Sequence, residues 1–267
     1  MERIGLIAGR GNFPLFFAQH AKNAGYHVTA VGVKKNTRPV LKKYVAILHW
    51  IEAKEFNRII DIFKKEDISK VAMAGQINPQ FLFNPKIMAS PDVEAFFGKI
   101  EDRRADTVFR AFVARLQKAH LELLDSTLFL SGYMPQEAVL TPRSPSEQEY
   151  KDVRFGFKIA KHLGIMDIGQ SVCVKNGVIL AVESIEGTDN AIRRAVSLTR
   201  SSIVLVKTSK PSQDMRFDVP VVGLGTIKNL SQGSCLAIEA GKTLFFDQHE
   251  ALRLAEKKDI AILAVSS

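Results

Sequence analysis

The chain has 267 residues, 46% of them hydrophobic, so it can bury the core of one large domain or of two smaller ones. It has neither an apolar run of the roughly 18 residues that a membrane-spanning helix requires nor a charged-then-apolar leader, so we expect a cytoplasmic protein. Its 37 basic and 28 acidic residues give a net charge of +9. That charge suits an anionic small molecule, a nucleic acid or an anionic membrane surface, and equally an ordinary basic soluble protein.

The first third of the chain predicts strands alternating with helices. Residues 4–9 form an apolar strand, the next segment has helical spacing up to Ala24, and His27–Val33 is a second strand. A helix over about 53–65 and a buried strand in "KVAMAG" follow. This alternation predicts an α/β fold with a parallel sheet.

The rest of the chain divides at a region rich in proline and polar residues. Residues 92–120 have a helical pattern, and "GYMPQEAVLTPRSPSEQ" is the best linker candidate. We therefore expect a parallel α/β domain over 1–131, a linker over 132–150 and a mixed α/β domain over 151–267. "SVCVKNGVILAVES" predicts a hairpin at Asn176-Gly177, and "CLAIEAGKTLFFD" predicts another near Gly241. The two cysteines, Cys173 and Cys235, lie in apolar runs and are expected to be reduced core residues.

The opening stretch "GLIAGRGNFP" raises the question of a dinucleotide site. It has two of the three glycines of such a fingerprint, and Pro14, which suits the first turn of a helix, stands where the third would be. The second strand ends in "GVKKN", without the acid that NAD requires, and no P-loop lysine follows the glycines. Either a purely structural turn or a turn whose N–H groups face a phosphate is consistent with these residues.

Acids and bases gather in two stretches of the second half. "KPSQDMRFDVP" contains Lys210, Asp214, Arg216 and Asp218, and in an extended chain the last three face one way. Such a face suits magnesium and phosphate together, although an exposed loop of solvated charges is the alternative. "ESIEGTDNAIRR" contains Glu183 and a Thr188-Asp189 pair that is equally typical of a helix cap.

Other chemistries have less support. The six histidines lack metal-ligand spacing, no G-x-S-x-G motif occurs, and neither cysteine has a base nearby in the sequence. Nucleic-acid binding would depend only on net charge and scattered lysines, so we do not expect it.

Four stretches together resemble a known family: "GLIAGRGNFP", "AGQI" at 74–77, "DIGQSVCVKNGVILAVESIEGTDNAIRR" at 167–194 and "KPSQDMRFDVPVVGLGTI" at 210–227. Their order and spacing are similar to those of the LpxI-type UDP-2,3-diacylglucosamine pyrophosphatases of lipid A biosynthesis, over nearly the whole chain. The chain departs from the family pattern in "RRADTVFR", where Asp106 stands alone, and at Gln76, where lysine or asparagine is common.

The resemblance implies magnesium-dependent hydrolysis of UDP-2,3-diacylglucosamine to UMP and 2,3-diacylglucosamine 1-phosphate. It also implies two domains, a Rossmann-like one over 1–131 and a distinct catalytic one over 151–267, with the lipid product bound between them and with access to the inner face of the inner membrane. Whether the chain forms a homodimer is left open by the sequence. With the charged clusters, it indicates these site residues: catalytic Asp218 and Arg216; substrate-binding Gly9, Gly11, Asn12, Gly75, Gln76, Gln170, Thr188, Asp189 and Lys210; and Mg²⁺ ligands Asp218, Asp214 and Glu183.

Two rival functions remain. A non-catalytic protein that senses a nucleotide sugar would keep the loops and the basic groups but would release no UMP. A nicotinamide oxidoreductase is disfavoured by Pro14 and by the missing acid after the second strand.

Overall fold

A computed structural model describes residues 2–266, which form two compact units. The first unit comprises the chain up to Ser131 together with Asp214–Asp218, and the second comprises Gly132–Gln213 and the chain from Val219 onward. The five-residue segment Asp214–Asp218 thus belongs to the first unit although both of its neighbours in sequence belong to the second.

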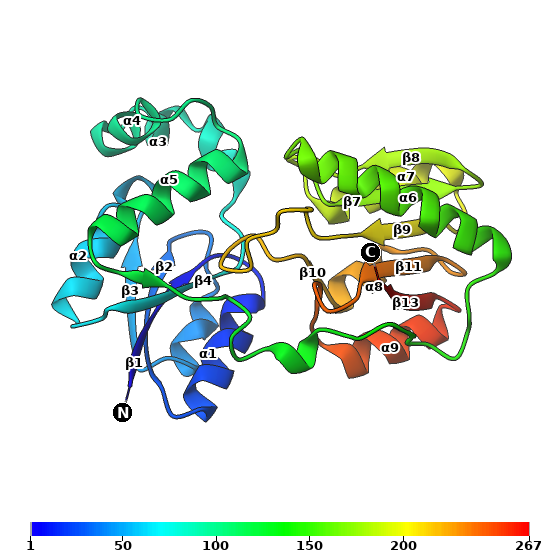
Figure 1. The fold of residues 1–267 in the computed structure, drawn as a ribbon, viewed down its shortest axis with the longest axis horizontal. Helices are drawn as coiled ribbons and strands as arrows, with labels where there is room; N and C mark the ends of the chain where they lie inside the picture. Colours follow the sequence, from blue (N-terminus) through cyan, green and yellow to red (C-terminus); the bar gives the residue numbers. More distant parts are fainter. Residues whose placement is uncertain (1, 267) are drawn as a thin grey trace. The chain divides into compact units, whose positions relative to one another are not determined.

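The first unit is built on a five-stranded parallel sheet with the strand order β3-β2-β1-β4-β5 (Figure 1). The apolar strands β1 and β2 are almost entirely buried, which is typical of a parallel sheet covered on both faces. The elements of this unit are β1 (Arg3–Ala8), α1 (Phe13–Asn23), β2 (His27–Val33), β3 (Ile47–Ile51), α2 (Arg58–Lys65), β4 (Lys70–Ala74), α3 (Pro85–Met88), α4 (Pro91–Phe97), α5 (Ala105–Lys118) and β5 (Glu122–Leu123).

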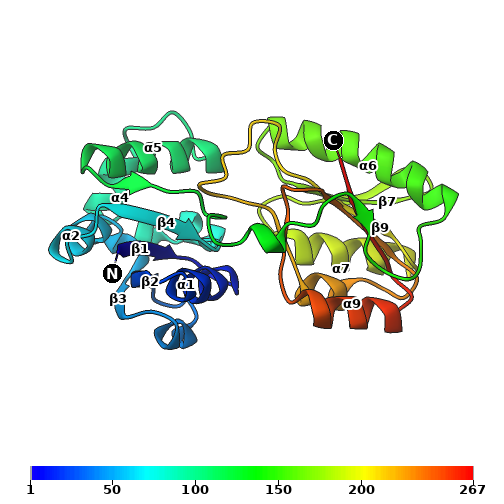
Figure 2. The same cartoon turned by 60° about the horizontal axis from the view of Figure 1, so that its bottom comes forward.

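Helices cover both faces of this sheet. Figure 2 shows α1 on one side and α5 on the other. Ile59 and Phe63 of α2 and Leu116 of α5 share one buried cluster with Val31 and Val71 of the strands, so α2 and α5 pack on the same face. The prediction of an α/β fold with a parallel sheet is confirmed.

Details of the first unit differ from the sequence predictions. Residues 92–120 form two helices, α4 and α5, because non-helical residues 98–104 interrupt the pattern. The helix expected over 53–65 is a short 3₁₀ turn, Ala53–Glu55, followed by α2. Strand β3 was not predicted at all. Pro14 does lie in the first turn of α1, as expected.

The second unit contains a six-stranded mixed sheet with the order β6-β13-β11-β9-β7-β8 (Figure 1). Strands β13, β11 and β9 run parallel, whereas β6, β7 and β8 are each antiparallel to a neighbour. The elements of this unit are β6 (Ala138–Val139), α6 (Glu147–Ile165), β7 (Ser171–Lys175), β8 (Val178–Val182), α7 (Thr188–Thr199), β9 (Val204–Lys207), β10 (Val221–Val222), α8 (Leu224–Asn229), β11 (Cys235–Glu239), β12 (Leu244–Phe245), α9 (Gln248–Lys257) and β13 (Ala261–Val265).

One of the two expected hairpins is confirmed. β7 and β8 are antiparallel and are joined at Asn176 and Gly177, both with positive φ. The second prediction is wrong, because β11 pairs in parallel with β9 and β13, and β12 pairs with β10 in a separate small sheet. The chain turns at Gly241, where φ is +65°, but the two flanking strands do not pair with each other.

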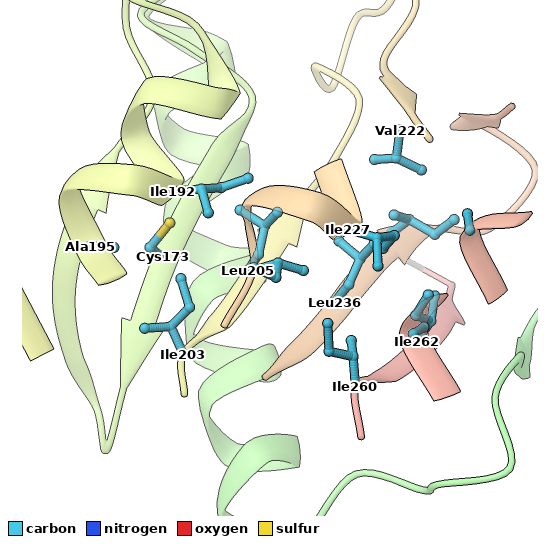
Figure 3. Packing of buried hydrophobic residues seen from close by; sticks show 14 of the residues in the cluster. Cys173, Ile192, Ala195, Ile203, Leu205, Val222, Ile227, Leu236, Ile260 and Ile262 are labelled. Carbon is cyan, nitrogen blue, oxygen red and sulfur yellow. The ribbon is translucent and has the colours of Figure 1, made fainter. Parts of the chain in front are cut away.

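Apolar clusters lie on both faces of the second sheet. Figure 3 shows one of them, in which Cys173, Leu205 and Leu236 of the strands pack with Ile192 of α7. Helix α6 packs in the other cluster, which contains Cys235. Both cysteines are buried free thiols, as predicted, and burial raises the pKa of Cys173 to about 12. None of the helices in the described part of the chain is long and apolar enough to cross a membrane.

The stretch 132–150 is partly ordered by the second unit. β6 is the edge strand of the sheet and pairs with β13, and α6 begins with a capping box in which Ser146 accepts from the Glu149 N–H and Glu149 accepts from the Ser146 N–H.

Candidate active site

The charged segment after β9 forms a turn. Its expected extended conformation is wrong, because the Phe217 N–H donates to the Asp214 carbonyl at 3.2 Å and closes the chain on itself. Asp214 and Arg216 nevertheless lie together. The Asp214 carboxylate accepts from the Arg216 backbone N–H at 3.0 Å, from Nε at 2.9 Å and from Nη2 at 2.7 Å.

Two residues earlier in the chain, one on α5 and one after β5, anchor this turn. The Phe217 ring is buried and stacks on Phe109 of α5, with centroids 5.1 Å apart. Ser126 is fully buried, and its hydroxyl lies 2.6 Å from the Arg216 carbonyl oxygen and 2.5 Å from that of Met73, sharing its single proton between them. The turn is therefore fixed to the end of β4 and to α5.

Asp214 and Arg216 stabilise each other's charged form. Hydrogen bonds from Arg216 hold the pKa of Asp214 below its usual range, against the opposing effect of partial burial, and the hydrogen bonds to Asp214 raise the pKa of Arg216. Asp214 occupies the Nε–Nη2 edge of the guanidinium. The Arg216 side chain is still 39% exposed, so a ligand can reach it.

Asp218 ends the turn in the left-handed region of backbone space, with φ at 55°. Aspartate and asparagine tolerate this region better than most residues, whereas a β-branched residue would not. The side chain is half-buried and directly follows the anchored Phe217. Its backbone is thus held in one conformation by a buried neighbour.

A second group of polar residues lies in the second unit, at the end of the sheet where β8 and β9 finish and β7 starts. The Thr188 hydroxyl donates to Glu183 Oε1 and accepts from Lys207 Nζ, both at 2.7 Å. The Gln170 N–H donates to Glu183 Oε2 at 3.4 Å. Gly169 allows the close approach, because a Cβ there would lie 2.2 Å from the Glu183 carbonyl oxygen.

Three of the predicted site residues in this group, Gln170, Glu183 and Thr188, therefore have structural partners. Burial by itself raises the pKa of Glu183, but the charge of Lys207 and the hydrogen bonds of Ser171 and Thr188 outweigh it, and the pKa lies below its usual range. Gly187 is the N-cap of α7, so Thr188-Asp189 is not the helix cap that the sequence left open. Asp189 is exposed in the first turn of α7.

Two lysine–carboxylate pairs lie at the same end of this sheet. Lys210 Nζ donates to Asp167 at 2.6 Å, and both side chains are more than nine-tenths buried. Glu239, at the end of β11, accepts from Lys161 Nζ at 2.7 Å and from the Ser209 N–H at 2.7 Å. This geometry gives Lys210 a local structural partner; its contact with substrate stays a prediction.

Glu239 makes the stability of the protein sensitive to acid. Burial by itself raises its pKa, but hydrogen bonds from Lys161, Ser209 and Lys242 outweigh burial, and the net pKa is lowered. The folded state therefore binds fewer protons than the unfolded state below the ordinary glutamate pKa of about 4.3, so the stabilisation is present above that pH and is lost as pH falls through the lowered value. We expect the slope of melting temperature against pH over this range to be shallower in Glu239→Gln than in wild type. The exposed Glu256→Gln is the control, and equal slopes in wild type and Glu239→Gln would contradict the assignment.

The opening glycine stretch lies at the carboxyl end of β1 and is tied to the loop after β4. The Gly9 N–H donates to the Ala74 carbonyl and the Arg10 N–H to the Gln76 carbonyl, both at 2.8 Å. A Cβ at Gly9 would lie 2.6 Å from the Gly75 backbone, and one at Gly75, where φ is +82°, would lie 2.5 Å from the Arg10 carbonyl oxygen. Gly9 and Gly75 thus permit close packing of two loops, and the first two N–H groups of the turn are already used.

Two arginines at this end of the sheet donate hydrogen bonds to amide side chains. Arg10 donates from Nε and Nη2 to Gln76 Oε1, at 3.1 and 2.6 Å, and Arg38 donates to Asn12 Oδ1. Gly11 has φ at +90° with open space around it. The predicted substrate-binding residues of the first unit, Gly9, Gly11, Asn12, Gly75 and Gln76, therefore come together.

Two of the proposed metal ligands, Asp214 and Glu183, have hydrogen-bonding partners within their own units. No group of three or more His, Cys, Asp or Glu residues suited to a metal ion occurs within residues 2–266. Asp214 is held by Arg216, and Glu183 by Thr188 and the Gln170 N–H. Magnesium commonly takes only one or two protein carboxylates together with substrate phosphates, so Asp218 remains compatible with such a role. Asp106 lies half-buried in the first turn of α5.

Several residues that shape these groups were missed from the sequence. Ser126 and Phe109 carry no local signal, because their partners in the turn, Arg216 and Phe217, lie about ninety residues or more further along the chain. Lys207 gave a weak signal, as a cation that ends an apolar strand. Arg10 lies inside the motif that drew attention, but its partner Gln76 lies beyond β4.

The fold and these residues define a two-unit α/β protein with polar groups at the ends of its strands. Residues 3–133 match the model of the LpxI N-terminal domain and residues 136–263 that of the LpxI C-terminal domain. The chain belongs to the LpxI family. It is 28% identical, over 99% of its length and 98% of the relative's, to the UDP-2,3-diacylglucosamine pyrophosphatase LpxI of Caulobacter vibrioides.

Two solved structures resemble the chain weakly. A biotin carboxylase domain of a single-chain bacterial carboxylase is 12% identical with a TM-score of 0.26, over 70% of this chain and 38% of that one. A phosphoribosylglycinamide synthetase from Anaerococcus prevotii is 11% identical with a TM-score of 0.24, over 76% of this chain and 44% of that one. The chain spans less than half of each, and at this similarity they carry no argument about function.

Proposed function

We propose that the protein is a magnesium-dependent enzyme that hydrolyses the pyrophosphate bond of UDP-2,3-diacylglucosamine to UMP and 2,3-diacylglucosamine 1-phosphate in lipid A biosynthesis. Full-length similarity to the Caulobacter pyrophosphatase carries the proposal. The protein acts in the cytoplasm and reaches its lipid-linked substrate at the inner face of the inner membrane. The net charge of +9 suits both an anionic substrate and an anionic surface.

The turn at 214–218 supports the assignment of catalytic roles. Arg216, accessible and held in one orientation by Asp214, neutralises charge on the diphosphate. Asp218 binds the metal or orients the attacking water. Asp214 acts as a positioning residue through Arg216. The bound magnesium would supply neutralisation of the phosphate oxygens and activation of water.

Lys210 and Glu183 take supporting roles in this proposal. Lys210 is paired with Asp167, and Glu183 accepts a hydrogen bond from Thr188, both at one end of the sheet in the second unit. We therefore assign both residues to holding the segment that leads into the catalytic turn.

Metal removal tests the proposal directly. We expect purified protein to release UMP from UDP-2,3-diacylglucosamine with magnesium and to lose this activity in excess EDTA, because the diphosphate requires a cation to neutralise its oxygens. Activity should return when magnesium is added beyond the EDTA. Undiminished turnover in EDTA would contradict the metal requirement, and substrate binding without UMP release under any condition would indicate a nucleotide-sugar-binding protein.

A further inference from the structure

The loops after β1, β2 and β4 form a basic edge. These strands are neighbours in the sheet and run parallel, so residues 9–12, 34–38 and 75–78 meet at one end of it. The sequence places four cations in these loops and no aspartate or glutamate. In open parallel sheets, ligands bind at the carboxyl ends of the strands where the strand order reverses, and here that point lies between β1 and β4.

The two arginines of this edge are oriented by neutral groups. Arg10 donates to the Gln76 amide oxygen and Arg38 to the Asn12 amide oxygen. Within residues 2–266 neither guanidinium forms an ion pair with a carboxylate, in contrast to Arg216. An amide oxygen fixes the direction of a guanidinium but leaves its full charge uncompensated. Both arginines are exposed.

The backbone beneath them is cross-linked before any ligand arrives. In addition to the bonds between residues 9–10 and the loop after β4, Asn36 Nδ2 donates to the Gln76 carbonyl at 3.2 Å, and its Oδ1 accepts from the Asn78 N–H at 3.1 Å. Thr37, which is buried, donates to the Ala8 carbonyl at 2.5 Å. Preorganised cations lose little conformational entropy on binding, which favours affinity.

We propose that Arg10 and Arg38 bind a phosphate group of the nucleotide-diphosphate substrate, with Gln76 and Asn12 as positioning residues that keep both charges available. The inference extends the proposed function and assigns substrate contacts to two arginines. A pair of guanidiniums suits phosphate oxygens because each presents a planar fork of donors. The bonds that the Gly9 and Arg10 N–H groups make to backbone carbonyls explain why side chains carry the recognition here.

The test replaces the neutral partner of Arg10 by a charged group of nearly the same shape. We expect Gln76→Glu to form an ion pair with Arg10 and to raise the Kd for UDP, measured by calorimetry, by about tenfold, the factor that corresponds to one lost charge-assisted hydrogen bond. Melting temperature should be unchanged or higher, because the fold gains an ion pair. Arg38→Gln, on a separate loop, should weaken UDP binding by a similar factor. The dependence of Kd on salt should become shallower in both variants.

Gln117→Glu provides the matched control, because it makes the same charge change at an exposed position on α5 of the same unit. Its Kd should stay within about twofold of wild type. UDP binding does not depend on turnover, so loss of the proposed hydrolysis would leave this result readable. No UDP binding by wild type, or equal affinity in wild type and both arginine-site variants, would overturn the proposal. The same variants are also tested for binding to phosphatidylglycerol vesicles by flotation. Loss of vesicle binding with UDP affinity intact would assign the arginines to the membrane surface and would also overturn the proposal.

Discussion

Asp218→Asn is expected to lower kcat by about a hundredfold or more, the scale for loss of a general base or of a group that activates metal-bound water. Asparagine keeps the size of the side chain and tolerates the left-handed backbone at φ 55°, so the turn should stay intact. Melting temperature and substrate Kd should change little, because Phe217 and Ser126 anchor the segment independently of the carboxylate. Single-turnover rates of UMP release measure the chemical step directly.

Asp67→Asn is the control for this substitution. Asp67 is exposed, belongs to the same unit and has nearly the same φ, 54°, so the change of charge and shape is matched. It should turn over substrate at the wild-type rate. An Asp218→Asn protein that binds substrate and hydrolyses it at near the wild-type rate would remove Asp218 from the catalytic residues, and lower stability with kcat preserved would assign it to the turn alone.

Glu183→Gln is expected to destabilise the protein by about 3 kcal/mol. The Thr188 hydroxyl bridges Glu183 and the buried Lys207, so the substitution removes the negative charge that compensates this lysine. Glutamine preserves an acceptor for Thr188 but cannot compensate the lysine. The midpoint of urea unfolding and the melting temperature at pH 7 measure the loss. At a temperature where the variant remains folded, we expect kcat to stay within a few-fold of wild type.

The same variant decides between a structural and a metal-binding Glu183. A metal ligand predicts the opposite pattern, with stability nearly unchanged, activity lost and the requirement for magnesium shifted to higher concentration. Glu256→Gln, an exposed glutamate of α9, should change neither quantity. A fully stable Glu183→Gln protein without activity would contradict the structural role.

Sequence by itself determined the features that depend on neighbouring residues. The alternation of strands and helices in the first unit, Pro14 in the first turn of α1 and the hairpin at Asn176-Gly177 all follow from local periodicity or from the backbone preferences of single residues. The order and spacing of four long motifs likewise indicated the family, which the matches to both LpxI domains confirmed.

Tertiary structure alone decided which charges meet. The stretch Cys235–Phe245 has the local pattern of a hairpin, yet β11 takes parallel partners because register depends on strands distant in sequence. Asp214 and Arg216 were expected in an extended segment, but they come together in a turn that is anchored by Ser126 and Phe109, which lie about 90 and about 110 residues earlier than their partners. The partner of Arg10 is the Gln76 amide because β1 and β4 are neighbours in the sheet. Local sequence does not encode that pairing, so it could not show whether Arg10 contacts an amide or a carboxylate.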